Sequence, residues 1–114
     1  MSFGRDRTPL KTEVTELDGV HRISVHGRVT LDSSPDLLDE FRRVVRHARQ
    51  LDVDLHDVPF VDSSGISVLI QGLKMAQERS VDFALLDPSP KVKAVIELSQ
   101  LDSFFTVKNS AGAE

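Results

Sequence analysis

The sequence predicts a single α/β domain in which a mixed β-sheet, opened by an antiparallel hairpin, is covered by α-helices. Asp18-Gly19 separates two strand-like runs, and this pair is a strong signal for a hairpin. Strand and helix patterns then alternate, giving the order β-β-α-β-α-β-α-β. Such repeated strand-helix-strand units imply parallel strands joined by right-handed crossovers. The length of 114 residues fits one domain with one core.

The first half of the chain contains two expected strands and one expected helix. One strand is expected from Leu10 to Leu17, and a second follows Gly19, with Ile23 and Val25 alternating. Pro35 suits a first helical turn, with Ser33 or Ser34 as its cap. We expect this helix to run from about Pro35 to Gln50. Its expected buried side consists of Leu37, Leu38, Phe41, Val44, Val45, Ala48 and Leu51.

The second half contains three further strands and two helices. The expected strands are 53–55, 81–86 and 104–107, and the expected helices are about 64–79 and 91–99. Gly72 lies inside the first of these helices, at a cost of about 1 kcal/mol relative to Ala, which indicates a close helix or sheet contact there, with a kink as the alternative. We expect residues 1–9 to form a flexible arm, 10–107 the domain and 108–114 a flexible tail.

Composition excludes several classes of protein. The formal net charge of −4 argues against direct binding of nucleic acid. The chain has no Cys, and no apolar run reaches the roughly 18 residues that membrane insertion requires. We therefore expect a cytoplasmic protein. A basic cluster is interpreted as the solvated face of a helix; its members are Arg42, Arg43, Arg46, His47 and Arg49.

No motif for catalysis is present. A serine hydrolase needs a base beside its serine, and the sequence has no G-x-S-x-G elbow. The four histidines, His21, His26, His47 and His56, are scattered and are interpreted as surface or edge residues. Zinc, EF-hand and P-loop motifs are absent. The sequence therefore predicts a protein that is not an enzyme and has no catalytic residue, metal site or cofactor.

Asp62-Ser63-Ser64-Gly65 lies at a junction between a strand and a helix. Its side-chain oxygens can cap the helix, and capping alone would explain one of them. Here three side chains with oxygens precede a glycine that lets another backbone approach. A helix N-terminus also favours an anion, so a phosphate on Ser63 or Ser64 would be tolerated. Sites in parallel sheets usually lie beyond the carboxyl ends of strands, where this junction and residues 30–33 both fall.

The chain resembles the STAS domain family of anti-sigma factor antagonists and sulfate-transporter cytoplasmic domains. The resemblance extends from about Leu10 to Val107 and rests on three segments: Gly27-Arg28-Val29, residues 60–69 (FVDSSGISVL) and residues 86–93 (LDPSPKVK). It implies a single STAS-like domain. It also implies phosphorylation of Ser63 by an anti-sigma factor that is itself a serine kinase, and a serine phosphatase that removes the phosphate. In the unphosphorylated form the domain would bind that kinase and release its sigma factor.

The resemblance also carries partner-binding roles to Asp62, Ser64 and Gly65. Many family members have Asp at the position of Thr30. In this chain the nearest Asp is Asp32, two residues later, so Thr30 and Asp32 are expected to contact the partner in a way particular to this chain. A second interpretation stays open, in which the domain is a non-catalytic STAS subunit of a phospholipid-transport ABC complex. A scaffold in a stress-sensing assembly is a third. The sequence leaves open the oligomeric state, the sigma factor and whether Ser33 or Ser34 is modified.

Overall fold

The structure of the protein is a computed structural model, which describes residues 10–110. Its elements follow the predicted order: β1 (Lys11–Leu17), β2 (Val20–His26), α1 (Ser34–Val44), β3 (Gln50–Asp57), α2 (Ser63–Glu78), β4 (Asp82–Leu86), α3 (Pro90–Leu98) and β5 (Thr106–Lys108). The expected arm 1–9 and residues 111–114 of the expected tail lie outside the described residues. The sheet itself continues to Lys108, one residue past the expected end of the domain.

The sheet has the strand order β1-β2-β3-β4-β5. β1 and β2 are antiparallel, and every later pair is parallel, as the alternating pattern predicted. Asp18 and Gly19 both have positive φ, at 54° and 83°, which is the backbone of a two-residue hairpin turn. This turn sets the register of the hairpin, from Leu17 opposite Val20 to Lys11 opposite His26. The mixed sheet with its opening hairpin is therefore confirmed.

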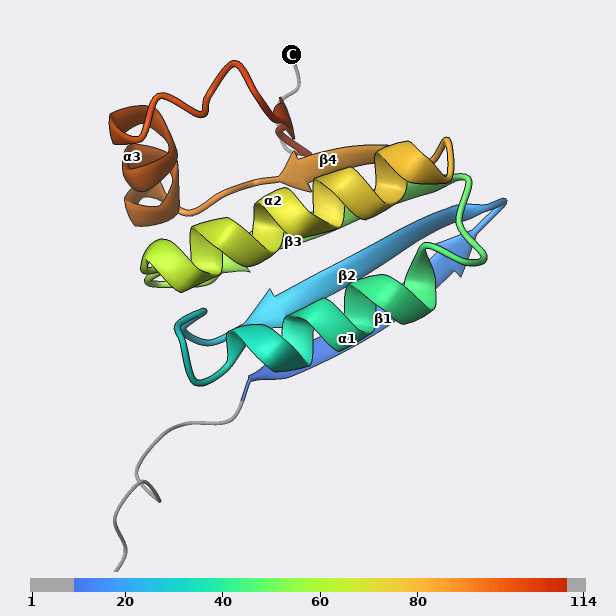
Figure 1. The fold of residues 1–114 in the computed structure, drawn as a ribbon, viewed down its shortest axis with the longest axis horizontal. Helices are drawn as coiled ribbons and strands as arrows, with labels where there is room; N and C mark the ends of the chain where they lie inside the picture. The colour runs from blue at the N-terminus through green and yellow to red at the C-terminus, as the bar shows by residue number, and fades with distance from the viewer. Residues whose placement is uncertain (1–9, 111–114) are drawn as a thin grey trace, which may run out of the picture.

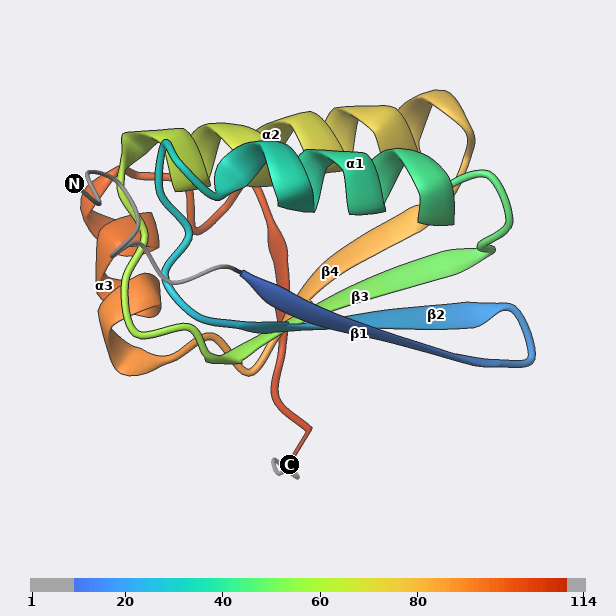
Figure 2. The same cartoon turned by 90° about the horizontal axis from the view of Figure 1, so that it is seen from below.

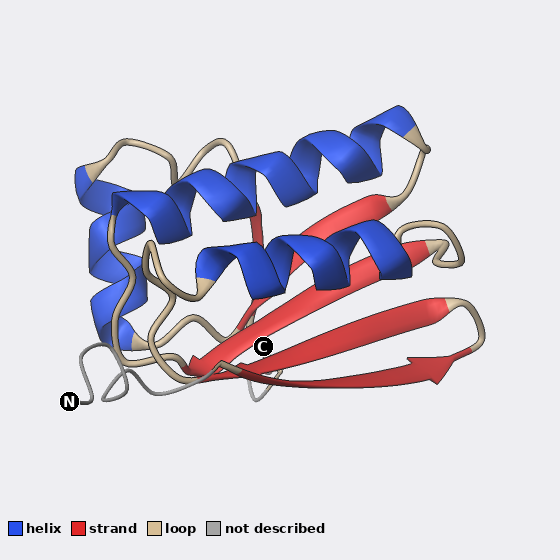
Figure 3. Ribbon diagram, turned by 60° about the horizontal axis from the view of Figure 1, so that its bottom comes forward, coloured by secondary structure: helices blue, strands red, loops and turns tan. Residues whose placement is uncertain are grey.

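Helices α1 and α2 lie side by side on one face of the sheet (Figures 1 and 2). No helix covers the opposite face within residues 10–110, and α3 lies at the end toward which β2 and β3 run (Figures 2 and 3). Alternate strand residues point to the helices and are buried, among them Ile23, Val53 and Leu85. Asp52 and Asp54 alternate with these residues along β3 and therefore point to the opposite face, where they too are buried.

The boundary between α1 and β3 differs from the expectation. The helix ends at Val44 rather than Gln50, and the strand is longer than the expected 53–55. The N–H groups of Arg49 and Gln50 both donate to the carbonyl of Gly19, which fixes the chain to the hairpin and starts β3. Leu51 therefore packs from the sheet and not from the helix. The helical spacing of apolar residues continues past Val44 only because the strand that follows also contains apolar residues, which happen to fall at helical intervals.

The contact predicted at Gly72 is confirmed. A Cβ built on this glycine would lie 2.6 Å from Cδ2 of Phe41, whose ring is fully buried between α1 and the sheet. The same ring packs edge-on against Phe83, with centroids 5.8 Å apart. The missing side chain therefore lets α2 pack closely against α1.

We predict that Gly72→Ala lowers the free energy of unfolding by about 1–2 kcal/mol, because displacement of Phe41 outweighs the gain in helix propensity. Urea denaturation would measure this, with Gln71→Ala, at the exposed neighbouring position, as a control expected to be close to neutral. A Gly72→Ala protein as stable as the wild type would contradict the packing described here.

Candidate functional site

Two loops meet beyond the carboxyl ends of β2 and β3. Residues 27–33 connect β2 to α1, and residues 58–62 connect β3 to α2. Val29 and Val61 form a parallel bridge between the loops. The Val29 N–H donates to the Phe60 carbonyl at 3.0 Å, and the Asp62 N–H donates to the Val29 carbonyl at 3.2 Å. The bridge extends the sheet by one step and places residues 30–33 beside the start of α2.

Asp62 holds both sides of this junction. It is the N-cap of α2, and its Oδ1 accepts a hydrogen bond from the Gly65 N–H at 2.9 Å. Its Oδ2 accepts from the Leu31 N–H, on the other loop, at 3.2 Å. Both carboxylate oxygens are thus engaged within the domain, and Asp62 has a structural role. Its predicted contact with a partner stays a prediction.

Gly65 permits the close approach that the sequence predicted. A Cβ at this position would lie 2.4 Å from the carbonyl oxygen of Val29 and 3.1 Å from the Val61 side chain. Because the nearest atom is the backbone oxygen of Val29, it could not move aside by a side-chain rotation. The glycine is therefore required for packing of α2 against the residue 27–33 loop.

Ser63 is the first residue of α2 and is exposed, while Ser64 is half-buried. The helix begins one residue before the expected Ser64. Asp62 accepts from the Gly65 N–H through its side chain and from the Ile66 N–H through its carbonyl. The N–H groups of Ser63 and Ser64, the first of the helix, have no intrahelical acceptor. The Ser63 hydroxyl is therefore accessible at a helix end that favours negative charge.

The cap expected for α1 is absent. Ser33 is the N-cap residue, but its side chain makes no capping bond. Instead its hydroxyl donates to the Arg28 carbonyl at 2.7 Å and accepts from the Thr30 N–H at 3.0 Å. Ser33 is buried and folds the loop onto itself, which leaves Thr30 half-buried and Asp32 exposed. The structure thus brings the predicted residues Thr30, Asp32 and Ser63 to one end of the domain.

Sequence reasoning missed an apolar component of this end. Leu31 is 72% exposed and Phe60 is 38% exposed, one on each loop. The guanidinium of Arg28 stacks over the Phe60 ring, 4.7 Å from its centroid. We call the exposed residues Arg28, Leu31, Phe60 and Ser63 the junction surface. The pairing of the two loops, which joins segments about 30 residues apart in the chain, was needed to bring Leu31 and Phe60 to the same end of the domain.

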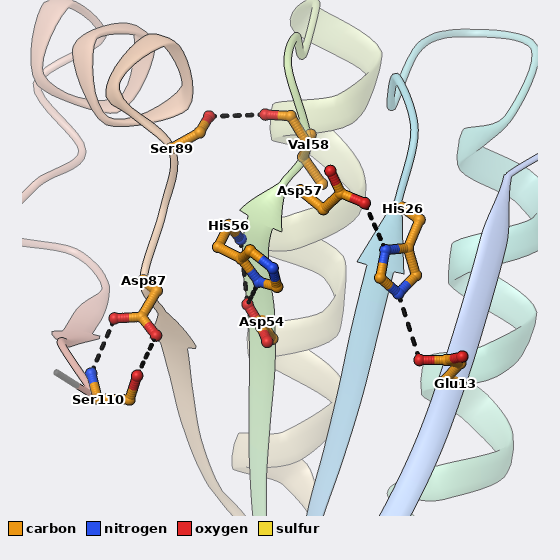
Figure 4. A network of polar contacts seen from close by, with 9 residues as sticks. All are labelled: Glu13, His26, Asp54, His56, Asp57, Val58, Asp87, Ser89 and Ser110. Atoms are coloured by element: carbon orange, nitrogen blue, oxygen red, sulfur yellow. Dashed lines mark hydrogen bonds and ion pairs between the residues drawn. The ribbon is translucent and has the colours of Figure 1, made fainter.

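Helix α3 is attached to the residue 58–62 loop. Ser89 caps it by accepting from the Val92 N–H, and the Ser89 hydroxyl donates to the Val58 carbonyl at 2.6 Å (Figure 4). The residue 58–62 loop is therefore bonded to two other segments, one from each side. This loop is held in place although it carries no regular structure.

Within residues 10–110, no group of three or more His, Cys, Asp or Glu side chains is arranged to hold a metal ion. No helix in that range is long and apolar enough to span a membrane. The four histidines do not approach Ser63 in any hydrogen bond of the described residues. At the junction, Ser63 is exposed at the first turn of α2.

The family is established by comparison with known proteins. A family model described as "Mlab, STAS domain" matches residues 13–107, and the chain belongs to the STAS domain family. An anti-sigma-B factor antagonist of Listeria monocytogenes is 25% identical over 105 residues, which is 90% of this chain and 92% of that protein. A STAS-domain containing protein of Pseudomonas aeruginosa is 26% identical over 85 residues, which is 75% of this chain and 84% of the other.

Solved structures agree on the fold. The crystal structure of an anti-sigma factor antagonist from Mycobacterium paratuberculosis is similar with a TM-score of 0.78 and 27% identity, covering 87% of this chain and 85% of that one. The anti-sigma factor antagonist SpoIIAA in its unphosphorylated form gives a TM-score of 0.72 at 16% identity, covering 85% and 87%. At that identity the second likeness shows the fold alone, and it confirms the predicted STAS-like domain.

We predict that Asp62→Ala lowers the free energy of unfolding by about 1 kcal/mol, because α2 loses its cap. It should also speed hydrogen exchange at the Leu31 amide, which loses its acceptor. Chemical denaturation and exchange measured by NMR would test both effects. Ser63→Ala, the adjacent substitution, leaves the cap intact and should change neither quantity. Equal stability of Asp62→Ala and the wild type would contradict the role given to this carboxylate.

Proposed function

We propose that this protein is an anti-sigma factor antagonist whose partner binding is controlled by phosphorylation of Ser63. The observation that carries the proposal is the exposed Ser63 hydroxyl at the N-terminus of α2, inside an otherwise hydrogen-bonded junction. Relatives named as antagonists support it, since one of them aligns over 90% of the chain. In this role the domain acts by binding and needs no catalytic residue of its own.

A phosphate on Ser63 is compatible with the fold. It adds about 1.5–2 negative charges next to the positive end of the helix dipole. The N–H groups of Ser63 and Ser64 can donate to phosphate oxygens, as at other anion sites on helix N-termini. The like charge of Asp62 is partly offset because its two oxygens already accept from N–H groups. Phosphorylation should therefore alter the surface and leave the domain folded.

The effect of the phosphate falls on the junction surface. The proposed partner packs against the exposed Leu31 and Phe60 and extends over Ser63, so that a phosphate there would introduce bulk and a desolvated charge. A loss of about 4 kcal/mol of binding free energy corresponds to roughly a thousandfold weaker affinity. The proposed partner of the unphosphorylated form is an anti-sigma factor with serine kinase activity, and a serine phosphatase restores that form. Ser64, Gly65, Thr30 and Asp32 are the proposed contacts around the hydroxyl.

A second candidate function is that of a non-catalytic STAS subunit in a phospholipid-transport ABC complex. It is favoured by one finding, the description of the matching family model as Mlab. In this role the same surface would hold a partner continuously. The two functions differ in whether a negative charge at Ser63 abolishes binding.

We predict that wild-type bait captures a serine kinase of the anti-sigma type from native lysate and that Ser63→Asp bait does not. Ser67→Asp is the matched control, because Ser67 is exposed one turn further along α2 and lies away from the helix end. Mass spectrometry of the captured proteins and of Ser63 itself would read the result. Capture of ABC transporter subunits by all three baits, with no phosphate on Ser63, would exclude the antagonist role and support the second candidate.

We further predict that Leu31→Ser weakens binding of the captured partner about tenfold or more, because an exposed apolar side chain at the centre of an interface loses its contact. Leu17→Ser is the control, since Leu17 is 74% exposed at the hairpin, the opposite end of the sheet. Titration calorimetry would compare the two. Equal weakening by both variants would show that the partner does not bind at the junction surface.

A further inference from the structure

His26 lies between two carboxylates that belong to different strands. Its Nδ1 is 2.6 Å from Oδ2 of Asp57 on β3, and its Nε2 is 3.3 Å from Oε1 of Glu13 on β1 (Figure 4). A neutral imidazole has one N–H and can donate to one of these oxygens only. The imidazolium has two N–H groups and can donate to both. The arrangement therefore fits the protonated ring.

The three residues join the strands at the end that supports the junction. His26 is the last residue of β2 and Asp57 the last of β3, so the loops 27–33 and 58–62 begin immediately after them. The Gly27 N–H donates to the Asp57 carbonyl at 3.2 Å, and the bridge between Val29 and Val61 follows. Any loosening between His26 and Asp57 would be transmitted first to this hydrogen bond.

We propose that His26 is a proton-operated clasp, which when protonated joins β1 to β3 across β2 and holds the two junction loops together. When the ring is neutral, one carboxylate loses its donor and the clasp is weakened. This inference concerns the domain alone and does not depend on the proposed function.

The other charged groups around His26 are two cations and two carboxylates that are engaged elsewhere. On β3, His56 approaches His26 edge-on with ring centroids 6.5 Å apart, and its Nδ1 is 2.8 Å from Oδ1 of Asp54. On β1, Lys11 lies opposite His26 in the register. Asp87, at the end of β4, binds Ser110. The two carboxylates in contact with His26 outweigh the repulsion of Lys11 and His56, which make no hydrogen bond to it.

The hydrogen bond to Asp57 raises the pKa of His26 above its ordinary range, with a smaller contribution from Glu13 and in spite of some desolvation. The pKa of Asp57 is lowered in return, chiefly by the same hydrogen bond. Because the pKa of His26 is higher in the folded than in the unfolded protein, its protonation stabilises the fold. This stabilisation is complete below the unfolded-state pKa of about 6.5 and is lost as the pH rises through the folded-state pKa. The clasp should therefore open as the pH rises through the raised pKa of His26, at a higher pH than that at which an unperturbed imidazole loses its proton.

We predict that hydrogen-exchange protection of the Gly27 and Val29 amides falls about two- to fivefold between pH 6 and pH 9. A decrease of this size is expected for the loss of an exposed ion pair. Protection factors corrected for the intrinsic rate at each pH would be measured by NMR, together with titration of the histidine rings. In His26→Asn the protection should not vary with pH. His47→Asn is the matched control and should keep the wild-type profile, since His47 is exposed between α1 and the start of β3, at the opposite end of that strand from Asp57.

A wild-type profile that matches that of His26→Asn, or a His26 ring that titrates at or below the ordinary value, would overturn the proposal. If His26→Asn does not fold, Glu13→Gln gives an independent test, because it removes one carboxylate and leaves the ring. The His26 titration should then shift to lower pH while that of His56 stays in place. An unchanged His26 titration in Glu13→Gln would show that β1 is not part of the clasp.

Discussion

The rest of the junction depends on the two hydrogen bonds that the carboxylate of Asp62 accepts. One oxygen caps α2 and the other accepts from the Leu31 N–H of the neighbouring loop, so a single side chain fixes the helix and the loop relative to each other. The contact is possible because Gly65 has no Cβ, which lets the Val29 carbonyl reach the first turn of the helix. The position of Ser63 at the start of α2 follows from these two constraints.

This arrangement separates the groups that stabilise the junction from the groups to which we assign the proposed regulation. The groups that hold the junction point inward, while Ser63, Leu31 and Phe60 point outward. A charge added at Ser63 therefore meets a helix end that tolerates it and a surface that a partner would cover. A loop is held in one conformation when rigid elements and hydrogen bonds restrain it. The hydrogen bonds from Asp62 and Ser89 restrain the two junction loops in this way and so fix the positions of the outward-pointing side chains.

The sequence predicted the order of elements because each signal was local. Asp18-Gly19 determined the hairpin and its register, and residues 62–64 indicated a helix cap, although only the structure shows that Asp62 is the residue that provides it. The end of α1 was wrong because the apolar spacing ran on into Leu51, and only the pairing of β3 with the hairpin shows where the strand begins. Ser33 was misread for a related reason, since its hydroxyl bonds within a loop whose shape is set by long-range contacts.

The same distinction applies to the site. The residues 62–65 were found because their types and spacing are meaningful within one short segment. Leu31, Arg28 and the partners of His26 come from segments far apart in the chain, and their neighbours depend on the parallel pairing of β2 with β3. The hairpin register alone could have placed His26 near β1, opposite Lys11, but not beside Asp57.

The most direct test of the central claim is the affinity of the purified anti-sigma partner for two forms of this protein, one unphosphorylated and one phosphorylated stoichiometrically on Ser63. The account predicts tight binding of the first form and binding weaker by roughly a thousandfold for the second, with both forms equally folded by circular dichroism. Equal affinity for the two forms would contradict it, and the junction would then be a constitutive docking surface rather than a switch.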